Sequence, residues 1–194
     1  NCEIIPDRIE AGSFALMAAA TKSTLKITNC NPEHILNLLT IFKKIGVDYE
    51  IGDNWLLVKE SNNIKPYSLK THEYPGFPTD LQSPYVVLMT QAQGSCLIQE
   101  TIYDRRLIWT DMLSQMGANI ITCDPHRVVI NGPTNLYGKK LISPDIRAGI
   151  ALVIAALIAQ GSTEIDNIYQ IDRGYEKLDE RLRLIGANIE RKEE

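Results

Sequence analysis

Residues 143–159 read Ser-Pro-Asp-Ile-Arg-Ala-Gly-Ile-Ala-Leu-Val-Ile-Ala-Ala-Leu-Ile-Ala, and the 12 residues from Ala148 to Ala159 carry no charge. A helix of this composition has no polar face to turn toward solvent, so it must be covered on every side. The apolar run is shorter than the roughly 20 residues that a membrane-spanning helix needs. We therefore predict a buried helix of a globular fold, begun by a Pro-Asp cap.

The pattern of this stretch occurs three times in the chain. Residues 5–20 and 77–92 show the same proline, a nearby aspartate and a long apolar run, so Asp7, Asp80 and Asp145 correspond. Each copy also ends on a matching glycine, and these glycines lie 71 and 69 residues apart: Gly46, Gly117 and Gly186. Such a regular spacing predicts three copies of one supersecondary unit.

Each unit is predicted to run strand, helix, strand, helix and then one or two strands. The first helix is the buried one. The second is amphipathic, with apolar residues at three- and four-residue steps, and belongs on the outside: Ile35, Leu38, Leu39 and Phe42; Trp109, Met112, Leu113 and Met116; Tyr175, Leu178, Leu182 and Ile185. We expect one α/β domain, an inside-out α/β barrel of three repeated βαβαββ-type units, the last incomplete, at about 1–65, 66–136 and 137–194.

The composition narrows the function classes. The net charge is −4 and the sequence has no basic stripe, which argues against nucleic acid as a binding partner. The cysteines lie far apart, which indicates reduced thiols in a cytoplasmic protein, and those in or beside strand-like runs should be inert: Cys2, Cys30, Cys96 and Cys123. The histidines lack metal-ligand spacing: His34, His72 and His126. We expect no metal, no cofactor and no membrane contact.

The repeat also indicates where a ligand would bind. Because the units repeat, the three buried helices should run parallel and begin at one end of the fold. Helix N-termini present unpaired N–H groups and partial positive charge, which favour anions and phosphate groups in particular. The sequence therefore predicts a site for a phosphorylated ligand at that end.

Six motifs follow one another along the chain: PDRIEAGSF, YPGFPTDLQSP, QETIYDRRL, SPDIRAGIAL, IYQIDRGYEKL and GANIER. Together, over residues 3–191, they resemble the UDP-N-acetylglucosamine 1-carboxyvinyltransferases, the enolpyruvyl transferases that begin peptidoglycan synthesis. The enzymes that make enolpyruvylshikimate phosphate share the fold, but PTDLQS and IDRGYE look more like the UDP-sugar enzymes.

The resemblance implies a cytoplasmic, two-domain transferase of which this chain is the C-terminal part. Its reaction moves the enolpyruvyl group of phosphoenolpyruvate to the 3-hydroxyl of UDP-N-acetylglucosamine through a tetrahedral ketal, with release of phosphate between two closing domains. This chemistry needs a base for the hydroxyl, an acid for the enol methylene and cations for phosphate and carboxylate. The implied biological roles are cell-wall biogenesis, cell shape, the cell cycle and cell division.

Asp80 has two alternative roles. Its correspondence to Asp7 and Asp145 favours a helix N-cap. By resemblance, it is instead the aspartate that contacts the sugar hydroxyl and takes its proton. Only the second copy has PGFPT before the acid and LQSP after it, a stiffer entry that favours an outward carboxylate. Both roles are compatible if the cap belongs to the open state and the base to the closed one.

Three arginines are candidate ligand contacts, because a guanidinium group matches carboxylate and phosphate oxygens. By resemblance, Arg173 holds phosphoenolpyruvate on domain closure, and Arg106 and Arg147 lie at or near the same cleft. The alternative for Arg106 and Arg147 is a salt bridge to a neighbouring acid, Asp104 or Asp145.

Ile102 completes the candidate site, and Asp172 has a structural role beside it. Ile102 matches the position whose backbone contacts the UDP-sugar, and its alternative is an ordinary buried strand residue. Asp172 should cap the outer helix that follows Arg173.

The chain also departs from the resemblance. The general-acid cysteine of the family lies on a loop of the other domain, and its Lys-Asn pair lies in an N-terminal segment; neither is found in this sequence, which begins without Met. A strand pair missing from the third unit would leave a sheet edge uncovered. We expect one half of an enzyme, inactive alone. The alternative is a stand-alone, non-catalytic module that binds UDP-sugars or acts as a scaffold.

Overall fold

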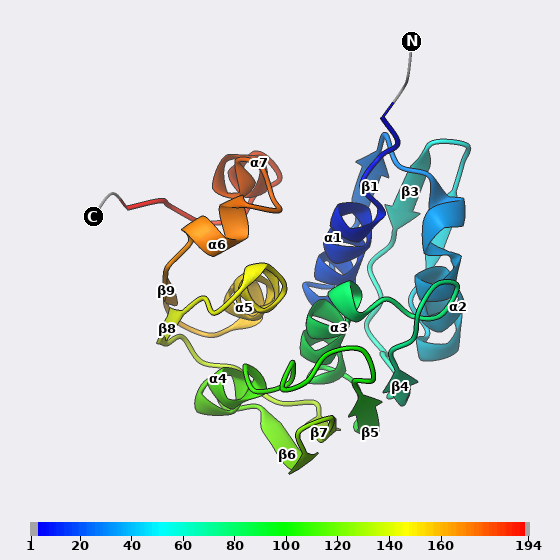
Figure 1. Ribbon diagram of the computed structural model, residues 1–194. Coiled ribbons are helices and arrows are strands. Elements are labelled where there is room, and N and C mark those ends of the chain that lie inside the picture. Colours follow the sequence, from blue (N-terminus) through cyan, green and yellow to red (C-terminus); the bar gives the residue numbers. More distant parts are fainter. Residues whose placement is uncertain (1–3, 193–194) are drawn as a thin grey trace.

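Three helices meet at the centre of the computed structural model, which describes residues 4–192. These helices, α1 (Arg8–Ala20), α3 (Gln82–Met89) and α5 (Ile146–Ile158), each contact the other two, and Figure 1 shows α1 and α3 side by side with α5 next to them. The predicted burial of α5 is confirmed for Ala148–Ala155, whereas its last turn is only half-buried. No helix within residues 4–192 is long and apolar enough to cross a membrane.

In the part of the chain that the structure describes, three separate small sheets surround these helices. The first consists of β1 (Leu25–Thr28), β2 (Tyr49–Ile51) and β3 (Trp55–Val58), antiparallel in the order β1-β3-β2. The second has the order β4-β5-β7-β6 and contains β4 (Leu69–Lys70), β5 (Gly94–Gln99), β6 (Asn119–Asp124) and β7 (Arg127–Gly132). The third is the parallel pair β8 (Lys140–Ile142) and β9 (Glu164–Asp166).

The sheets differ in which strands they contain. In the second sheet, β4 lies parallel to β5 on one side, and the antiparallel pair β7-β6 lies on the other. Within residues 4–192, the first sheet has an equivalent of the antiparallel pair β7-β6 but no strand equivalent to β4. The third has the parallel strands but no pair, and residues 186–192 form no strand. These residues correspond to β6, which pairs with β7, and within residues 4–192 the third sheet has no strand equivalent to β7.

The amphipathic segments form the outer helices, as predicted, but they are shorter than expected. They are α2 (Leu36–Ile45) with the 3-10 turn η1 (Pro32–Ile35) before it, α4 (Thr110–Gln115), α6 (Tyr169–Asp172) and α7 (Leu178–Leu184). Their inward residues Phe42, Leu113 and Leu182 are fully buried. The prediction was wrong for Ile185, which follows the end of α7 and is 53% exposed.

The three matching glycines all have a positive φ angle. Gly46, Gly117 and Gly186 have φ of 85°, 108° and 100°, a region that residues with a Cβ rarely adopt. Gly46 ends α2 in this left-handed conformation, which is the usual way for glycine to stop a helix. The recurrence of glycine in the sequence therefore has a local backbone cause at each of these positions.

Candidate functional site

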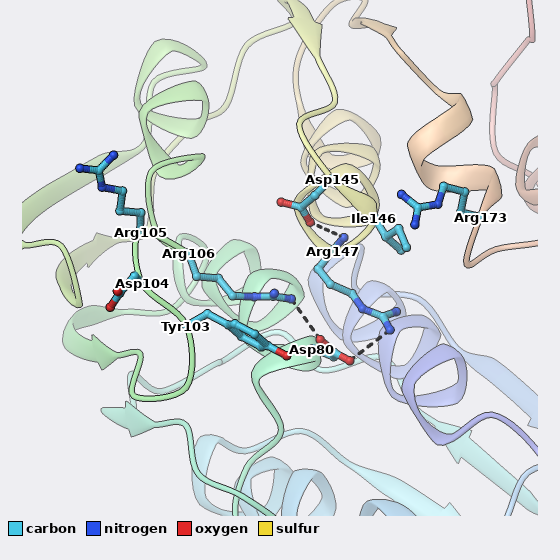
Figure 2. A pocket seen from close by; sticks show the side chains of 9 residues that line it. All are labelled: Asp80, Tyr103, Asp104, Arg105, Arg106, Asp145, Ile146, Arg147 and Arg173. Carbon is cyan, nitrogen blue, oxygen red and sulfur yellow. Dashed lines mark hydrogen bonds and ion pairs between the residues drawn. The ribbon is translucent and has the colours of Figure 1, made fainter.

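An open cavity of about 450 Å³ lies where α3 and α5 begin. Its lining carries four arginines and three aspartates, and so a net charge of +1. Figure 2 shows these side chains together with the other two that line the cavity. The lining residues are Asp80, Tyr103, Asp104, Arg105, Arg106, Asp145, Ile146, Arg147 and Arg173. We call this cavity the arginine pocket.

Asp80 is not a helix cap, so that alternative was wrong. The cap prediction holds for Asp7, whose Oδ1 accepts the N–H groups of Ile9 and Glu10, and for Asp145 at the start of α5. Asp80 instead lies inside a separate 3-10 turn, η2 (Thr79–Leu81), which precedes α3 and has no side-chain cap. The inserted turn places the Asp80 carboxylate ahead of the helix, where it faces the arginine pocket.

Two arginines from distant segments hold the Asp80 carboxylate. Arg106 Nη2 donates to Oδ1 at 3.0 Å, and Arg147 Nη2 donates to Oδ2 at 3.1 Å. Figure 2 shows the two guanidinium groups reaching the two oxygens separately, whereas Arg105 points away. All three paired side chains are at most one-third exposed, at 33% for Asp80, 17% for Arg106 and 22% for Arg147. Charge-assisted bonds of this kind are stronger and more directional than those between neutral groups.

The predicted alternative partners of these arginines are therefore wrong. Asp145 uses its carboxylate on the backbone N–H groups of Arg147 and Ala148, at 2.7 and 3.0 Å. Asp104 is almost fully exposed and lies 3.4 Å from His126 Nε2. Neither acid pairs with a pocket arginine in residues 4–192, so both cations remain available for Asp80.

Arg106 has two further features. Its guanidinium lies over the ring of Tyr103, 5.2 Å from the centroid. Its Nε is buried and has no hydrogen-bond partner within residues 4–192. A buried donor without an acceptor is unfavourable, and a bound anion would reach this N–H only after the side chains that cover it move.

Arg173 lines the same pocket from the other side of α5. It follows the last residue of α6, and its Nη1 donates to Gln170 Oε1 at 3.0 Å. In residues 4–192 no carboxylate pairs with it. The predicted cap role of Asp172 was wrong, because its carboxylate binds Arg191 at 2.8 and 2.9 Å, which lowers the pKa of Asp172.

Ile102 lies outside the pocket lining. Its backbone N–H donates to Glu100 Oε1 at 2.7 Å, so a backbone contact with a ligand would have to use its carbonyl. The sequence-based reasoning missed Glu100 and Tyr103. The available signal for Glu100 was an acid two residues after the apolar strand residues Cys96–Ile98, close enough to the core that burial would require hydrogen-bond partners.

Known proteins match nearly the whole chain, in sequence and in structure. The family profile described as EPSP synthase (3-phosphoshikimate 1-carboxyvinyltransferase) matches residues 1–182. The chain belongs to the EPSP synthase family. Within this family, it is a homologue of UDP-N-acetylglucosamine 1-carboxyvinyltransferases, being 43% identical to the one from Treponema denticola and 45% identical to the second one of Listeria monocytogenes serotype 4b, over 97% of this chain in both comparisons. The chain spans about half the length of these relatives, 46% and 44%.

Solved structures of the family share the fold. The enolpyruvyl transferase NikO from Streptomyces tendae superposes on 96% of this chain with a TM-score of 0.88 at 24% identity, and an EPSP synthase from Acinetobacter baumannii on 95% with 0.75 at 16%. The match covers 44% and 46% of those chains. The chain therefore has a mixed α/β enolpyruvyl transferase fold and corresponds to part of the full-length family members.

The described cysteines lie away from the arginine pocket. Cys30 and Cys96 are buried, and Cys123 is exposed; Cys2 lies outside the described residues. Burial raises the pKa of the Cys96 thiol to about 11 and also raises that of Cys30. Since the thiolate is the reactive form, both thiols should be inert in the folded chain. Residues 4–192 hold no cluster of His, Cys, Asp and Glu that could bind a metal.

Thiol labelling tests this assignment. In a Cys2→Ser variant treated with iodoacetamide at pH 8, we expect Cys123 to react and Cys30 and Cys96 to stay unmodified until the chain is unfolded in urea. Mass spectrometry of the digested protein identifies the modified residue. A Cys123→Ser, Cys2→Ser double variant is the control and should take up no label. Rapid labelling of Cys96 in the native double variant would show that its strand is not buried.

Proposed function

We propose that this chain is one half of a UDP-N-acetylglucosamine enolpyruvyl transferase, which acts in peptidoglycan precursor synthesis in the cytoplasm. The observation that carries the proposal is the Asp80 carboxylate held between Arg106 and Arg147, with Arg173 in the same pocket. Its relatives are named UDP-N-acetylglucosamine 1-carboxyvinyltransferases and are 43% and 45% identical to this chain. This supports UDP-N-acetylglucosamine as the acceptor and phosphoenolpyruvate as the donor of the carboxyvinyl group. The second half of the site would come from polypeptide outside this chain.

The first proposed role is that of Asp80 as the base. Its two arginine contacts fix both oxygens at the edge of the pocket, and a fixed acceptor is what proton transfer from a sugar hydroxyl requires. The hydroxyl oxygen then bonds to C2 of phosphoenolpyruvate while the methylene carbon gains a proton from an acid outside this chain. Loss of phosphate and of one methyl proton completes the transfer.

The second proposed role is that of the cations. Arg173 binds the phosphate or carboxylate of phosphoenolpyruvate, since no carboxylate within residues 4–192 competes for it. Arg106 and Arg147 help to neutralise the charge that accumulates as phosphate leaves. Ile102 contacts the UDP-sugar through its carbonyl. Fixed charges in a closed, dry pocket stabilise such a transition state far more than they would in water.

We further propose that residues 1–194 form a single domain of three units, about 1–65, 66–136 and 137–194, arranged as an inside-out α/β barrel. The three contacting helices and the order of strands in the second sheet support this arrangement. Strands that the first and third sheets do not contain within residues 4–192 would be supplied by the rest of the protein.

Reconstitution tests the proposed function. The chain is mixed with the remaining half of the Treponema denticola relative, and phosphate release is measured with both substrates present. We expect release from the mixture and none from either half alone. In parallel, UDP-N-acetylglucosamine should shift the backbone amide NMR signals of Asp80, Ile102, Arg147 and Arg173 in a saturable way. Saturable binding without phosphate release in the mixture would instead identify a non-catalytic UDP-sugar-binding module.

A further inference from the structure

Glu100 is a buried acid beside the arginine pocket but outside its lining. It directly follows β5, and the residue is only 1% exposed. Within residues 4–192 its carboxylate is satisfied by hydrogen bonds alone. Burying a carboxylate without a cation costs free energy unless each oxygen accepts hydrogen bonds. The groups that donate these hydrogen bonds are therefore held in fixed positions around Glu100.

One oxygen of Glu100 holds the segment that leads to Arg106. Oε1 accepts the backbone N–H groups of Ile102 at 2.7 Å and Tyr103 at 3.2 Å. It also accepts the hydroxyl of Thr71 at 3.0 Å, which ties the segment to the end of β4. The backbone before Arg106 is therefore fixed in a tight turn around the carboxylate.

The other oxygen of Glu100 holds the turn that carries Asp80. Oε2 accepts the hydroxyl of Thr79 at 2.8 Å. Thr79 is the first residue of η2 and directly precedes Asp80, and η2 has no side-chain cap of its own. The bond to Glu100 therefore fixes the start of this turn, whose end is held by the buried side chain of Leu81.

We propose that Glu100 is a positioning residue that sets the distance between Asp80 and Arg106. These two residues are 26 positions apart in the sequence, yet a single carboxylate bonds to the turn of one and to the segment before the other. An apolar residue of similar size would fill the same volume but would align neither. The relevance of this role to catalysis rests on the proposed function, whereas the geometry is measurable without substrate.

Thr79→Val is the sharpest test, because valine keeps the shape of threonine and removes only the bond to Oε2. In the substrate-free chain, we expect the Arg106 Nε–H NMR signal to move toward the position of a free arginine. In the reconstituted enzyme we expect kcat to fall ~10-fold, the equivalent of one hydrogen bond, with an unchanged KM for UDP-N-acetylglucosamine. Thr79→Ser keeps the hydroxyl and should behave as the unmodified chain.

Thr90→Val is the matched control. It also removes a hydroxyl bond of a buried threonine, but this bond goes to the Val87 carbonyl at the end of α3 opposite to η2. We expect it to lower the urea midpoint of unfolding and to leave both the Arg106 signal and kcat unchanged. An unchanged Arg106 signal in Thr79→Val, or an equal shift in Thr90→Val, would overturn the inference. If the unmodified mixture has no turnover, the proposed function fails, and the Arg106 signal alone decides the role of Glu100.

Discussion

Asp80→Asn should nearly abolish turnover in the reconstituted enzyme and, at the same time, tighten the binding of inorganic phosphate to the chain. Asparagine cannot take the proton of the sugar hydroxyl, a role worth ~10²–10⁴-fold in rate. It also removes the negative charge that pairs with Arg106 and Arg147 at 3.0 and 3.1 Å. The two guanidinium groups would then bind an anion without competition, with about tenfold higher affinity. Phosphate release and calorimetric titration with phosphate measure the two effects.

The matched control for Asp80→Asn is Asp104→Asn. It makes the same change in charge within the same pocket, but the Asp104 side chain is 91% exposed and lies 3.4 Å from His126 Nε2 instead of against an arginine. We expect turnover and phosphate affinity to stay within about twofold of the unmodified chain, as is usual for an exposed ion pair. Equal effects of the two variants would mean that the overall charge of the pocket, and not the position of Asp80, determines turnover and phosphate affinity. Full turnover in Asp80→Asn would refute the role of Asp80 as base.

Arg147→Met should raise the KM for phosphoenolpyruvate ~100-fold and also lower kcat. Methionine fills much of the same volume, so the packed stem at the start of α5 is retained while the cation is lost. Truncating one partner of a poorly exposed charge pair typically costs 2–5 kcal/mol, or about 30-fold and more in affinity. Asp80 would also lose one of its two anchors. Steady-state kinetics with each substrate varied in turn separates these effects.

Arg105→Met is the comparison variant for Arg147→Met. Arg105 lines the same pocket, but its side chain points away from Asp80 (Figure 2). Because a solvated charge at this position is screened by salt, we expect less than about a threefold change in KM. Similar kinetics for the two variants would mean that the pocket acts through its overall positive charge, and that the ion pair with Asp80 has no special role.

The central helices could be predicted from the sequence because their composition leaves few alternatives. Residues such as Ile150, Leu152 and Ile154 succeed one another without a polar position, and only an interior location accommodates such a run. The pocket residues Asp80, Arg106, Arg147 and Arg173 were chosen by resemblance, and the structure brings them to one cavity. Their roles in a reaction stay a proposal.

The partners of these residues could not be predicted, because each interaction depends on the tertiary structure. Sequence proximity favoured Asp104 and Asp145 as partners of the arginines, whereas the carboxylate that binds them lies 26 and 67 positions away. The repeat likewise favoured a cap role for Asp80, since alignment cannot show that a 3-10 turn is inserted before α3. Glu100 was missed for the same reason, because its partners come from three separate segments.

The unequal sheets also affect how local stability is distributed around the pocket. Asp80 and Arg106 belong to segments next to the four-stranded sheet, whereas Arg173 follows the two-stranded pair β8-β9. A two-stranded sheet contributes little stability of its own, so in the chain without the rest of the protein local unfolding should need the least free energy on the Arg173 side. If a ligand contacts both Asp80 and Arg173, part of its binding free energy is used to order the Arg173 side of the pocket. Its affinity would therefore report on the folding of the third unit as well as on its contacts.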